Sequence, residues 1–294
     1  MRLTDQPLRS THHVSELGEW ELAYRTPVSP LQPFVYPYCG YRESSLAITD
    51  RREVAGIIVP IIINLGPALD VSVPGQPETF ERFDGPFVAG LHGGHTVVRT
   101  IGEQTGVQVN LSPIGARVLF GMPMSELANR VVTLEDVLGA DAAILVERLR
   151  AVPDWSTRFD FLDAALLRRF AASSGPSVVM AWTWTRIVAE GGNVDVAALA
   201  GRCGWSNKRL IAEFRDQLGL PPKLVGRIVR FNGARRAIEQ YGTARSLASI
   251  AEQCGYYDQA HFNHDFREFA GIPPLEYLRT QLPDVGGFSA ASTV

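Results

Sequence analysis

The pattern of hydrophobic and polar positions changes twice along the chain. From Trp20 to about Asn110, short apolar or alternating runs are separated by Gly, Pro and Asp, which predicts β-strands. The runs are WELAY, FVYPYCGY, GIIVPIIINLG, LDVSV, ETFERF, FVAGL, TVVRTIG and GVQVNL. Many short strands at this spacing are typical of a small barrel or sandwich. The preceding segment, with His12 and His13, is expected to be a tail.

After Leu111 the apolar positions recur every three to four residues, which predicts helices. Ser112-Pro113 is expected to begin one helix, and Ser125 to cap a short second one. Longer helices are expected over residues 141–151 and 154–172. The apolar stripe of the last helix is compatible with internal packing or with pairing of two subunits.

The last third of the chain repeats one pattern about 51 to 52 residues apart. The copies are LAGRCGWSNKRLIAEFRDQLGLPPK, from Leu199 to Lys223, and IAEQCGYYDQAHFNHDFREFAGIPPL, from Ile250 to Leu275. In each copy a short helix is expected to end at Cys-Gly, and Ser206 or Asp258 to cap the helix that follows. A closing glycine and Pro-Pro end the unit. The pattern predicts two helix-turn-helix motifs.

The second helix of each copy has an apolar face and an outward face, at about 100° per residue. The outward residues are candidates for contact with DNA, and for each the alternative is an ordinary solvated position. They are Asn207, Lys208, Arg209, Ala212 and Arg215 in the first copy, and Gln259, Ala260, His261, His264 and Arg267 in the second. Lysine or arginine can reach guanine, glutamine can bridge to adenine, and alanine can touch a thymine methyl group.

The duplicated pattern resembles the DNA-binding domain of the AraC/XylS family of bacterial transcription regulators, over residues 178–283. The most specific pieces are GLPPKLVGRIVRFNGA and AEQCGYYDQAHFNHDFREFAGIPPLEYL. The resemblance implies a linker helix over Lys223 to Glu239, which carries Arg227, Arg230, Arg235 and Arg236. The chain departs from the family at Ala212 and His264, where members often place a long basic or polar side chain, and at Tyr257, where a small capping serine is common. The bases that are read therefore stay open.

A strand-rich half joined to such a domain looks like a sensor of the same family, and such sensors are often cupin-like barrels that hold a small molecule. The fold class expected is therefore α+β, with a β-rich cupin-like sensor that ends in helices and an all-α domain of two helix-turn-helix motifs joined by a linker helix. The expected division is a sensor or oligomerisation domain over 1–172, a linker over 173–177, a DNA-binding domain over 178–283 and a disordered tail over 284–294.

Candidate ligand and metal chemistry in the first half is sparse. Aromatic residues crowd the first strands, where they could line an apolar pocket or simply pack. They are Trp20, Tyr24, Phe34, Tyr36, Tyr38 and Tyr41, and the ligand-binding candidates among them are Trp20, Tyr24, Tyr36 and Tyr38. His92 and His95 are the one pair that resembles metal ligands, but the richer set of a cupin enzyme is missing, which favours packing histidines. No phosphate-binding loop or nucleophile elbow is found, so neither an enzyme nor a cofactor is expected.

Composition and charge limit the setting. No signal-peptide pattern begins the chain, the apolar run Val54 to Leu65 is too short to span a membrane, and three scattered cysteines predict neither disulfides nor zinc, so a cytoplasmic protein is expected. Cys203 and Cys254 are expected to be buried thiols. The net charge of −3 divides into +3 over residues 182–283, −5 over residues 1–181 and −1 from Asp284. The basic excess falls on the duplicated motif.

Three functions stay open from the sequence. The first is a transcription regulator that binds double-stranded DNA and is controlled by a small-molecule effector. Its expected partners are a second copy in a homodimer and, for an activator, RNA polymerase. The second is an effector-independent DNA-binding protein whose residues 1–172 are an oligomerisation or partner-binding scaffold. The third is a metal-dependent cupin enzyme tethered to DNA.

Overall fold

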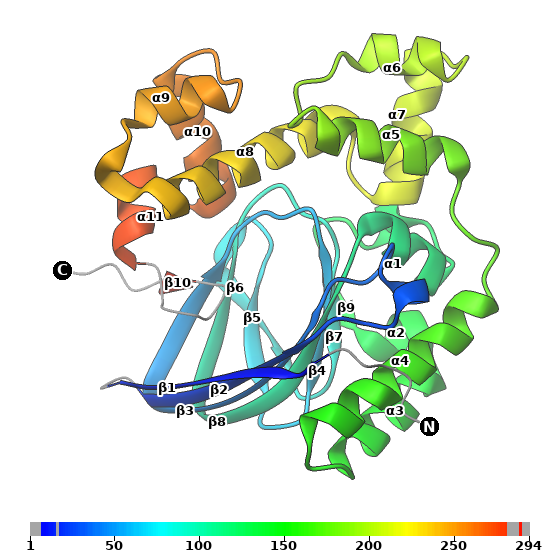
Figure 1. Ribbon diagram of the computed structural model, residues 1–294, viewed down its shortest axis with the longest axis vertical. Helices are drawn as coiled ribbons and strands as arrows, with labels where there is room; N and C mark the ends of the chain where they lie inside the picture. The colour runs from blue at the N-terminus through cyan, green and yellow to red at the C-terminus, as the bar shows by residue number, and fades with distance from the viewer. Residues whose placement is uncertain (1–6, 16–17, 281–287, 290–294) are drawn as a thin grey trace.

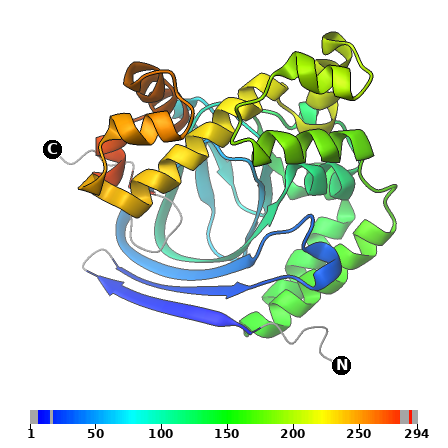
Figure 2. The same cartoon turned by 45° about the horizontal axis from the view of Figure 1, so that its top comes forward.

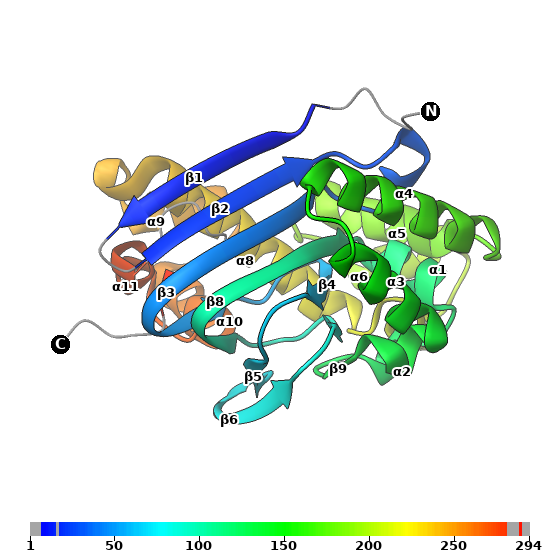
Figure 3. The same cartoon turned by 90° about the horizontal axis from the view of Figure 1, so that it is seen from below.

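The first part of the chain forms one strongly curved antiparallel sheet in the computed structural model, which describes residues 7–15, 18–280 and 288–289. The strand order is β1-β2-β3-β8-β4-β7-β9, with β5 paired to β8, β6 to β5, and β10 to β3. Figure 3 shows β1, β2, β3 and β8 side by side along the outer surface. The strands are β1 (Arg9–Ser15), β2 (Gly18–Arg25), β3 (Tyr38–Glu53), β4 (Val59–Asn64), β5 (Leu69–Val73), β6 (Gln76–Phe83), β7 (Phe87–Ala89), β8 (Thr96–Leu111), β9 (Val131–Thr133) and β10 (Phe288–Ser289).

Helices cover part of the convex face of this sheet. They are α1 (Pro113–Phe120), α2 (Leu134–Leu138), α3 (Ala140–Arg150) and α4 (Trp155–Ala171), with single turns η1 (Ser29–Leu31) and η2 (Met124–Glu126). The apolar stripe of α4 is used internally, because Phe159 and Leu162 are buried and Phe159 stacks on Tyr38 at 5.4 Å. Gly40 has no room for a side chain, since a Cβ atom there would lie 2.5 Å from the Trp155 ring. The stripe is therefore core rather than a free dimer surface.

The rest of the chain is helical. It contains α5 (Val178–Ala189), α6 (Val196–Arg202), α7 (Asn207–Leu218), α8 (Pro222–Tyr241), η3 (Gly242–Ala244), α9 (Leu247–Gln253), α10 (Gln259–Ala270) and α11 (Pro274–Thr280). The long helix α8 crosses above the rim of the sheet, with α5, α6 and α7 at one end and α9, α10 and α11 at the other (Figures 1 and 2). The predicted fold class, a β-rich domain followed by a helical domain with two helix-turn-helix motifs, is confirmed. Within the described residues, no helix has the length and apolarity needed to cross a membrane.

Several predicted details of the first half are wrong. His12 and His13 lie in β1, which pairs with β2 over its whole length, rather than in a tail. The strands β3 and β8 are each 16 residues long. The strand expected to end at Tyr41 therefore continues through a polar stretch to Glu53, and the two expected strands TVVRTIG and GVQVNL form the single strand β8. Ser125 lies inside the turn η2, whose N-cap is Pro123.

Of the tail predicted at the end of the chain, residues 284–287 and 290–294 lie outside the described residues, and Phe288–Ser289 pair with β3.

Candidate DNA interface and a cavity in the β-rich domain

The first helix-turn-helix consists of α6 and α7. Between them Gly204 adopts a φ of +69°, a conformation that a side chain would strain. Ser206 then caps α7 as predicted, because its Oγ accepts a hydrogen bond from the backbone N–H of Arg209 at 3.3 Å. Leu210, Phe214 and Leu218 are fully buried along one side of α7. The apolar spacing thus fixes which face of α7 points outward.

The second helix-turn-helix consists of α9 and α10 and follows the same plan. Gly255 has a φ of +78° at the turn, and a Cβ atom there would lie 2.2 Å from the side chain of Asn193. Asp258 Oδ1 accepts a hydrogen bond from the backbone N–H of His261 at 2.7 Å and so caps α10. Phe262, Phe266 and Phe269 form the buried face. The two thiols of the repeat, on Cys203 and Cys254, are partly buried rather than buried as predicted.

The linker helix α8 holds the two motifs together. Phe231 packs edge-on against Phe266 at 4.9 Å, so the second motif shares its core with α8. Arg227 extends from α8 to α10, where Nη2 donates to Asp265 Oδ1 at 2.6 Å and Nη1 donates to Glu268 Oε1 at 3.2 Å. Since Asp265 is fully buried, its charge depends on this arginine. Two of the linker arginines that the family resemblance singles out are therefore structural, because Arg235 is likewise bonded to Glu239.

The structure brings the predicted DNA-contacting residues to the outward faces of α7 and α10. All five of the first set are exposed, and in the second set His261 alone is only partly so. The guanidinium of Arg209 lies over the Trp205 ring, 4.4 Å from its centroid, which holds it near the start of α7. The exposed residues are Asn207, Lys208, Arg209, Ala212, Arg215, Gln259, Ala260, His264 and Arg267. Their roles in DNA contact stay predictions.

A hollow of about 710 Å³ separates the two motifs on the side of α8. Its lining includes Lys223, Arg230, His261 and His264, which come from α8 and α10. The sequence marks Arg230 only as a residue of the linker helix and does not indicate that these side chains meet. Asp195 and Asp265 also line the hollow, and Asp265 is paired with Arg227, so Lys223 and Arg230 are the cations that could meet a phosphate backbone there.

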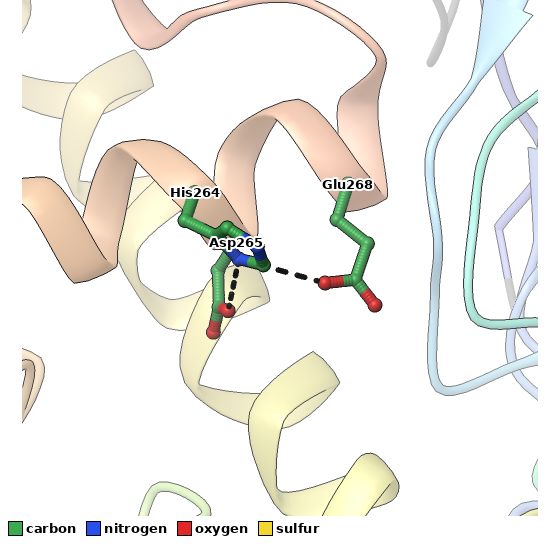
Figure 4. Close-up of side chains that lie close together, drawn as sticks. All are labelled: His264, Asp265 and Glu268. Carbon is green, nitrogen blue, oxygen red and sulfur yellow. Dashed lines mark ion pairs between the residues drawn. The ribbon is translucent and has the colours of Figure 1, made fainter.

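His264, Asp265 and Glu268 also form a group whose ligand atoms lie within 4.8 Å of one another (Figure 4). His264 Nδ1 is 3.7 Å from Asp265 Oδ1 and 3.7 Å from Glu268 Oε2. Both carboxylates are already paired with Arg227. A metal ion would have to compete with this guanidinium, so we interpret the group as part of the ion-pair network that anchors α10 to α8.

The β-rich domain encloses a cavity of about 190 Å³ between β3, β8 and the strands that face them. Inward residues alternate along both long strands, as the pleat of a sheet requires. On β3 they are Cys39, Tyr41, Glu43, Arg51 and Glu53, and on β8 they are Thr96, Val98, Thr100, Gln104 and Gln108. Across the two strands Glu43 is opposite Gln104, and Glu53 is opposite Thr96. Of these side chains only Tyr41 is among the aromatic residues that the sequence marks as possible pocket lining.

The four aromatic residues predicted to bind a ligand are not on the wall of this cavity. Tyr38 points to the opposite face, where its hydroxyl donates to Asp163 Oδ1 at 2.8 Å. Trp20 stacks on His13 at the edge of the sheet, and Tyr36 is 41% exposed. Tyr24 lies opposite Cys39 in the register, but it does not contribute to the lining. The cavity wall is thus formed by other residues, among them the inward side chains of β3 and β8.

His92 and His95 occupy the boundary between the cavity and the helical domain. His92 lines the cavity, and its Nδ1 is 2.8 Å from the carbonyl oxygen of Gly94. Burial lowers the pKa of His92, and burial, Arg52 and His92 together lower the pKa of His95 to about 4. Both rings are neutral near pH 7. The interpretation of the two as packing residues agrees with this environment.

The helical domain is docked on the rim of the cavity by the segment after β3. The backbone N–H of Ala55 donates to the carbonyl oxygen of Phe269 in α10 at 3.0 Å. The carbonyl oxygen of Ala55 accepts from Asn232 Nδ2 in α8 at 3.0 Å. A Cβ atom on Gly271 would lie 2.4 Å from the His95 ring, so the chain after α10 passes directly over that histidine. The neighbours of Ala55 in sequence, Val54 and Gly56, line the cavity.

Two capped helix pairs joined by one long helix define a helix-turn-helix DNA-binding protein. Residues 199–280 match the family Helix-turn-helix domain, and residues 24–133 match the family Domain of unknown function (DUF6597). The C-terminal domain belongs to the AraC type of bacterial transcription regulators, which confirms the resemblance found in the sequence, and the chain is a DNA-binding transcription regulator.

The chain is distantly similar to several proteins of known structure. No curated protein matches the chain significantly. ToxT from Vibrio cholerae is 13% identical with a TM-score of 0.45, covering 83% of this chain and 96% of that chain. A structure of ToxT with bound unsaturated fatty acid is 11% identical with a TM-score of 0.44, covering 81% and 96%. A 7S globulin from Momordica charantia is 9% identical with a TM-score of 0.26, covering 57% and 47%.

Proposed function

We propose that this regulator places α7 and α10 in successive major grooves of one DNA site, and that a small molecule in the cavity of the β-rich domain controls how the two helices are presented. Two recognition helices on one linker helix suit grooves about 34 Å apart. The position of Ala55 is the observation that supports control of the helical domain by a ligand in the cavity. Its backbone binds both α8 and α10, while the residues on either side of it form the cavity wall.

The coupling follows from this short connection. A ligand that changes the position of Val54 or Gly56 would alter the two hydrogen bonds of Ala55, and these bonds hold α8 and α10 against the rim. Only a difference in ligand affinity between the docked and undocked arrangements can shift their balance. A ligand that binds the docked arrangement better would restrain the recognition helices, and one that binds the undocked arrangement better would release them.

DNA contact is tested by changing one exposed arginine on each recognition helix. Arg209→Ala and Arg267→Ala should each weaken binding to the selected site by roughly 1 to 3 kcal/mol, with relaxed specificity where a base is read. Arg82→Ala is the matched control, because Arg82 is an exposed arginine on β6 in the other domain. Fluorescence anisotropy with a labelled site measures all three. If both variants bound as tightly as the control, the proposed recognition faces would be wrong.

Control by an effector is tested by removing and restoring bound small molecules. Native mass spectrometry of the purified protein identifies what is released, and DNA affinity and oligomeric state are then measured with and without that molecule. We expect a change in at least one of the two. Identical affinity and identical oligomeric state in both conditions would exclude the switch and favour a scaffold role for residues 1–172.

A further inference from the structure

Four side chains on the cavity wall each have one buried polar atom without a hydrogen-bond partner among the described residues. The atoms are Glu43 Oε1, Arg51 Nε, Thr100 Oγ1 and Gln104 Oε1. Three of these residues are more than nine-tenths buried, at 8% exposure for Glu43, 4% for Thr100 and 1% for Gln104. Buried polar groups are normally paired, because an unpaired one costs stability. Four such atoms around one cavity indicate a partner that the chain itself does not supply.

The hydrogen-bonding character of these atoms favours a donor. The Glu43 and Gln104 oxygens only accept, and the Thr100 hydroxyl can accept as well as donate. Glu43 and Gln104 lie directly opposite each other in the register of β3 and β8, so one group placed between them can reach both. Arg51 Nε is the single donor of the four, and its guanidinium is already engaged by Glu43 through Nη2.

The charges around the cavity favour a cation. Glu43 and Glu53 face it, and Arg51 is the one strongly basic side chain among its lining residues. Glu43 is paired with Arg51, and burial raises the pKa of Glu53 to about 7, so this carboxyl is only partly ionised near neutral pH. The other titratable groups on the wall, Cys39, Tyr41 and His92, are neutral near pH 7, because burial raises the pKa of the thiol and the phenol and lowers that of the imidazole. An anionic ligand would have to displace Glu43 from Arg51 and approach Glu53. A cation meets the unpaired oxygen of Glu43 and the ionised fraction of Glu53.

Most of the remaining wall is apolar, apart from Thr96 and Gln108, and the space is small. Leu22, Ile58, Ile62, Val71 and Phe87 are among the side chains that close the cavity. A volume of about 190 Å³ lies below the range of roughly 300 to 1,000 Å³ that is usual for pockets of drug-sized ligands. A polyhydroxylated ligand would leave its own hydroxyl groups against these walls without partners, whereas a compact hydrocarbon group fits them.

We propose that the effector is a small primary amine, bound as its ammonium ion between Glu43 and Gln104, with a compact apolar group against the aliphatic wall. Thr100 accepts a further hydrogen bond from the same end of the ligand. This inference rests on the proposed function for its regulatory meaning, but the binding itself is independent of DNA.

The test compares three probes of equal chain length with different head groups: hexylamine, 1-hexanol and hexanoic acid. Isothermal titration and thermal shift are measured at neutral pH on the full chain. We expect hexylamine to bind and to raise the melting temperature, 1-hexanol to bind at least about tenfold more weakly, and hexanoic acid not to bind. Equal binding of the amine and the alcohol, tighter binding of the acid, or no binding of any probe would overturn the proposal.

Variants locate the head group. Glu43→Gln should weaken hexylamine binding by roughly tenfold or more while leaving 1-hexanol unchanged, because it removes the charge but keeps the shape. Glu103→Gln is the matched control, since Glu103 is exposed on β8 beside Gln104. Thr100→Val keeps the volume and removes the hydroxyl, and it should also weaken hexylamine selectively. Should Glu43→Gln fail to fold, Thr100→Val decides, and hexylamine binding unaffected by it would contradict the proposed site.

The failure of this inference is distinguishable from the failure of the proposed function. If hexylamine does not bind but the chain still selects one DNA site and releases another class of molecule, the amine assignment is wrong and the regulator stands. If hexylamine binds as expected but DNA affinity and oligomeric state do not respond to it, the site is correct and the regulatory coupling is wrong.

Discussion

Replacement of Arg227 tests whether the second recognition helix depends on one buried ion-pair network. Arg227→Met removes the guanidinium that binds Asp265 and Glu268 but keeps most of the aliphatic length. Asp265 is fully buried, and its Oδ2 already has no hydrogen-bond partner among the described residues. Loss of one partner of a buried pair costs roughly 3 to 5 kcal/mol. Because the side chain of Arg227 is itself 25% exposed, we expect the lower end, about 3 kcal/mol.

The assay is urea unfolding followed by circular dichroism, together with hydrogen exchange of the α10 amides and footprinting on the selected DNA site. We expect a lower unfolding free energy, faster exchange in α10 and a footprint reduced to the half that α7 contacts. Arg236→Met is the matched control, because Arg236 is an exposed arginine on the same helix, and its change should stay within about 0.5 kcal/mol.

A second variant separates a lost interaction from an unpaired charge. Arg227→Met combined with Asp265→Leu removes both charges, and we expect it to recover most of the stability lost in the single variant. If Arg227→Met unfolded at the same urea concentration as Arg236→Met, Asp265 would not need its partner. The account of how α10 is anchored to α8 would then be refuted.

Three further changes test the pH response, the docking and the first motif. Burial raises the pKa of Glu53 from 4.5 to about 7, so the contribution of this carboxyl to folding stability is fully present below pH 4.5 and is lost as the pH rises through 7. Glu53→Gln should remove this loss and raise the free energy of unfolding above pH 7 by up to about 3 kcal/mol relative to the wild type, as measured by urea unfolding at several pH values. If the free energy of unfolding of Glu53→Gln depended on pH as that of the wild type does, the raised pKa of Glu53 would be refuted. Asn232→Leu leaves the Ala55 carbonyl without its donor and should cost about 1 to 2 kcal/mol, with faster hydrogen exchange along α8; wild-type exchange would mean that this contact does not hold the domains together. Phe214→Ala opens a fully buried site and should cost roughly 3 to 5 kcal/mol, leaving a footprint of the α10 half alone, whereas an intact footprint would refute the role of α7.

The helical half could be predicted from the sequence because its local signals agree with its packing. Ser206 and Asp258 cap the expected helices, and the apolar spacing from Leu210 to Leu218 predicts the buried face of α7. These interactions are made within one helix or between neighbouring helices of the repeat. A pattern of three to four residues is therefore sufficient to place them.

The cavity could not be predicted from the sequence because many of the polar side chains of the long strands face the enclosed side of the sheet rather than solvent. On β8 the apolar residues Val107, Val109 and Leu111 face the covering helices, while Gln104 and Gln108 face inward. An alternating pattern alone does not say which face is enclosed, and polar residues on one face are typical of a solvated one. The same ambiguity hid the long extension of β3, whose inward side chains include Glu43 and Glu53.

The four aromatic candidates for ligand binding do not line the cavity, for a related reason. Sequence proximity brought Trp20, Tyr36 and Tyr38 together as a possible pocket, but a shift of one position turns a side chain to the other face of a strand. Tyr38 is thus in the outer core with Phe159, whereas its neighbour Cys39 lines the cavity. Only the register between β2, β3 and β8 resolves which residues share a wall.

The measurement that tests the central claim most directly is selection of genomic DNA fragments by the purified full-length protein over a series of salt concentrations. Two recognition helices on one linker predict enrichment of a single site that spans two successive major grooves, with affinity that falls steeply as salt rises. Diffuse binding without sequence preference, or a site confined to one groove, would contradict a regulator that reads DNA with both α7 and α10.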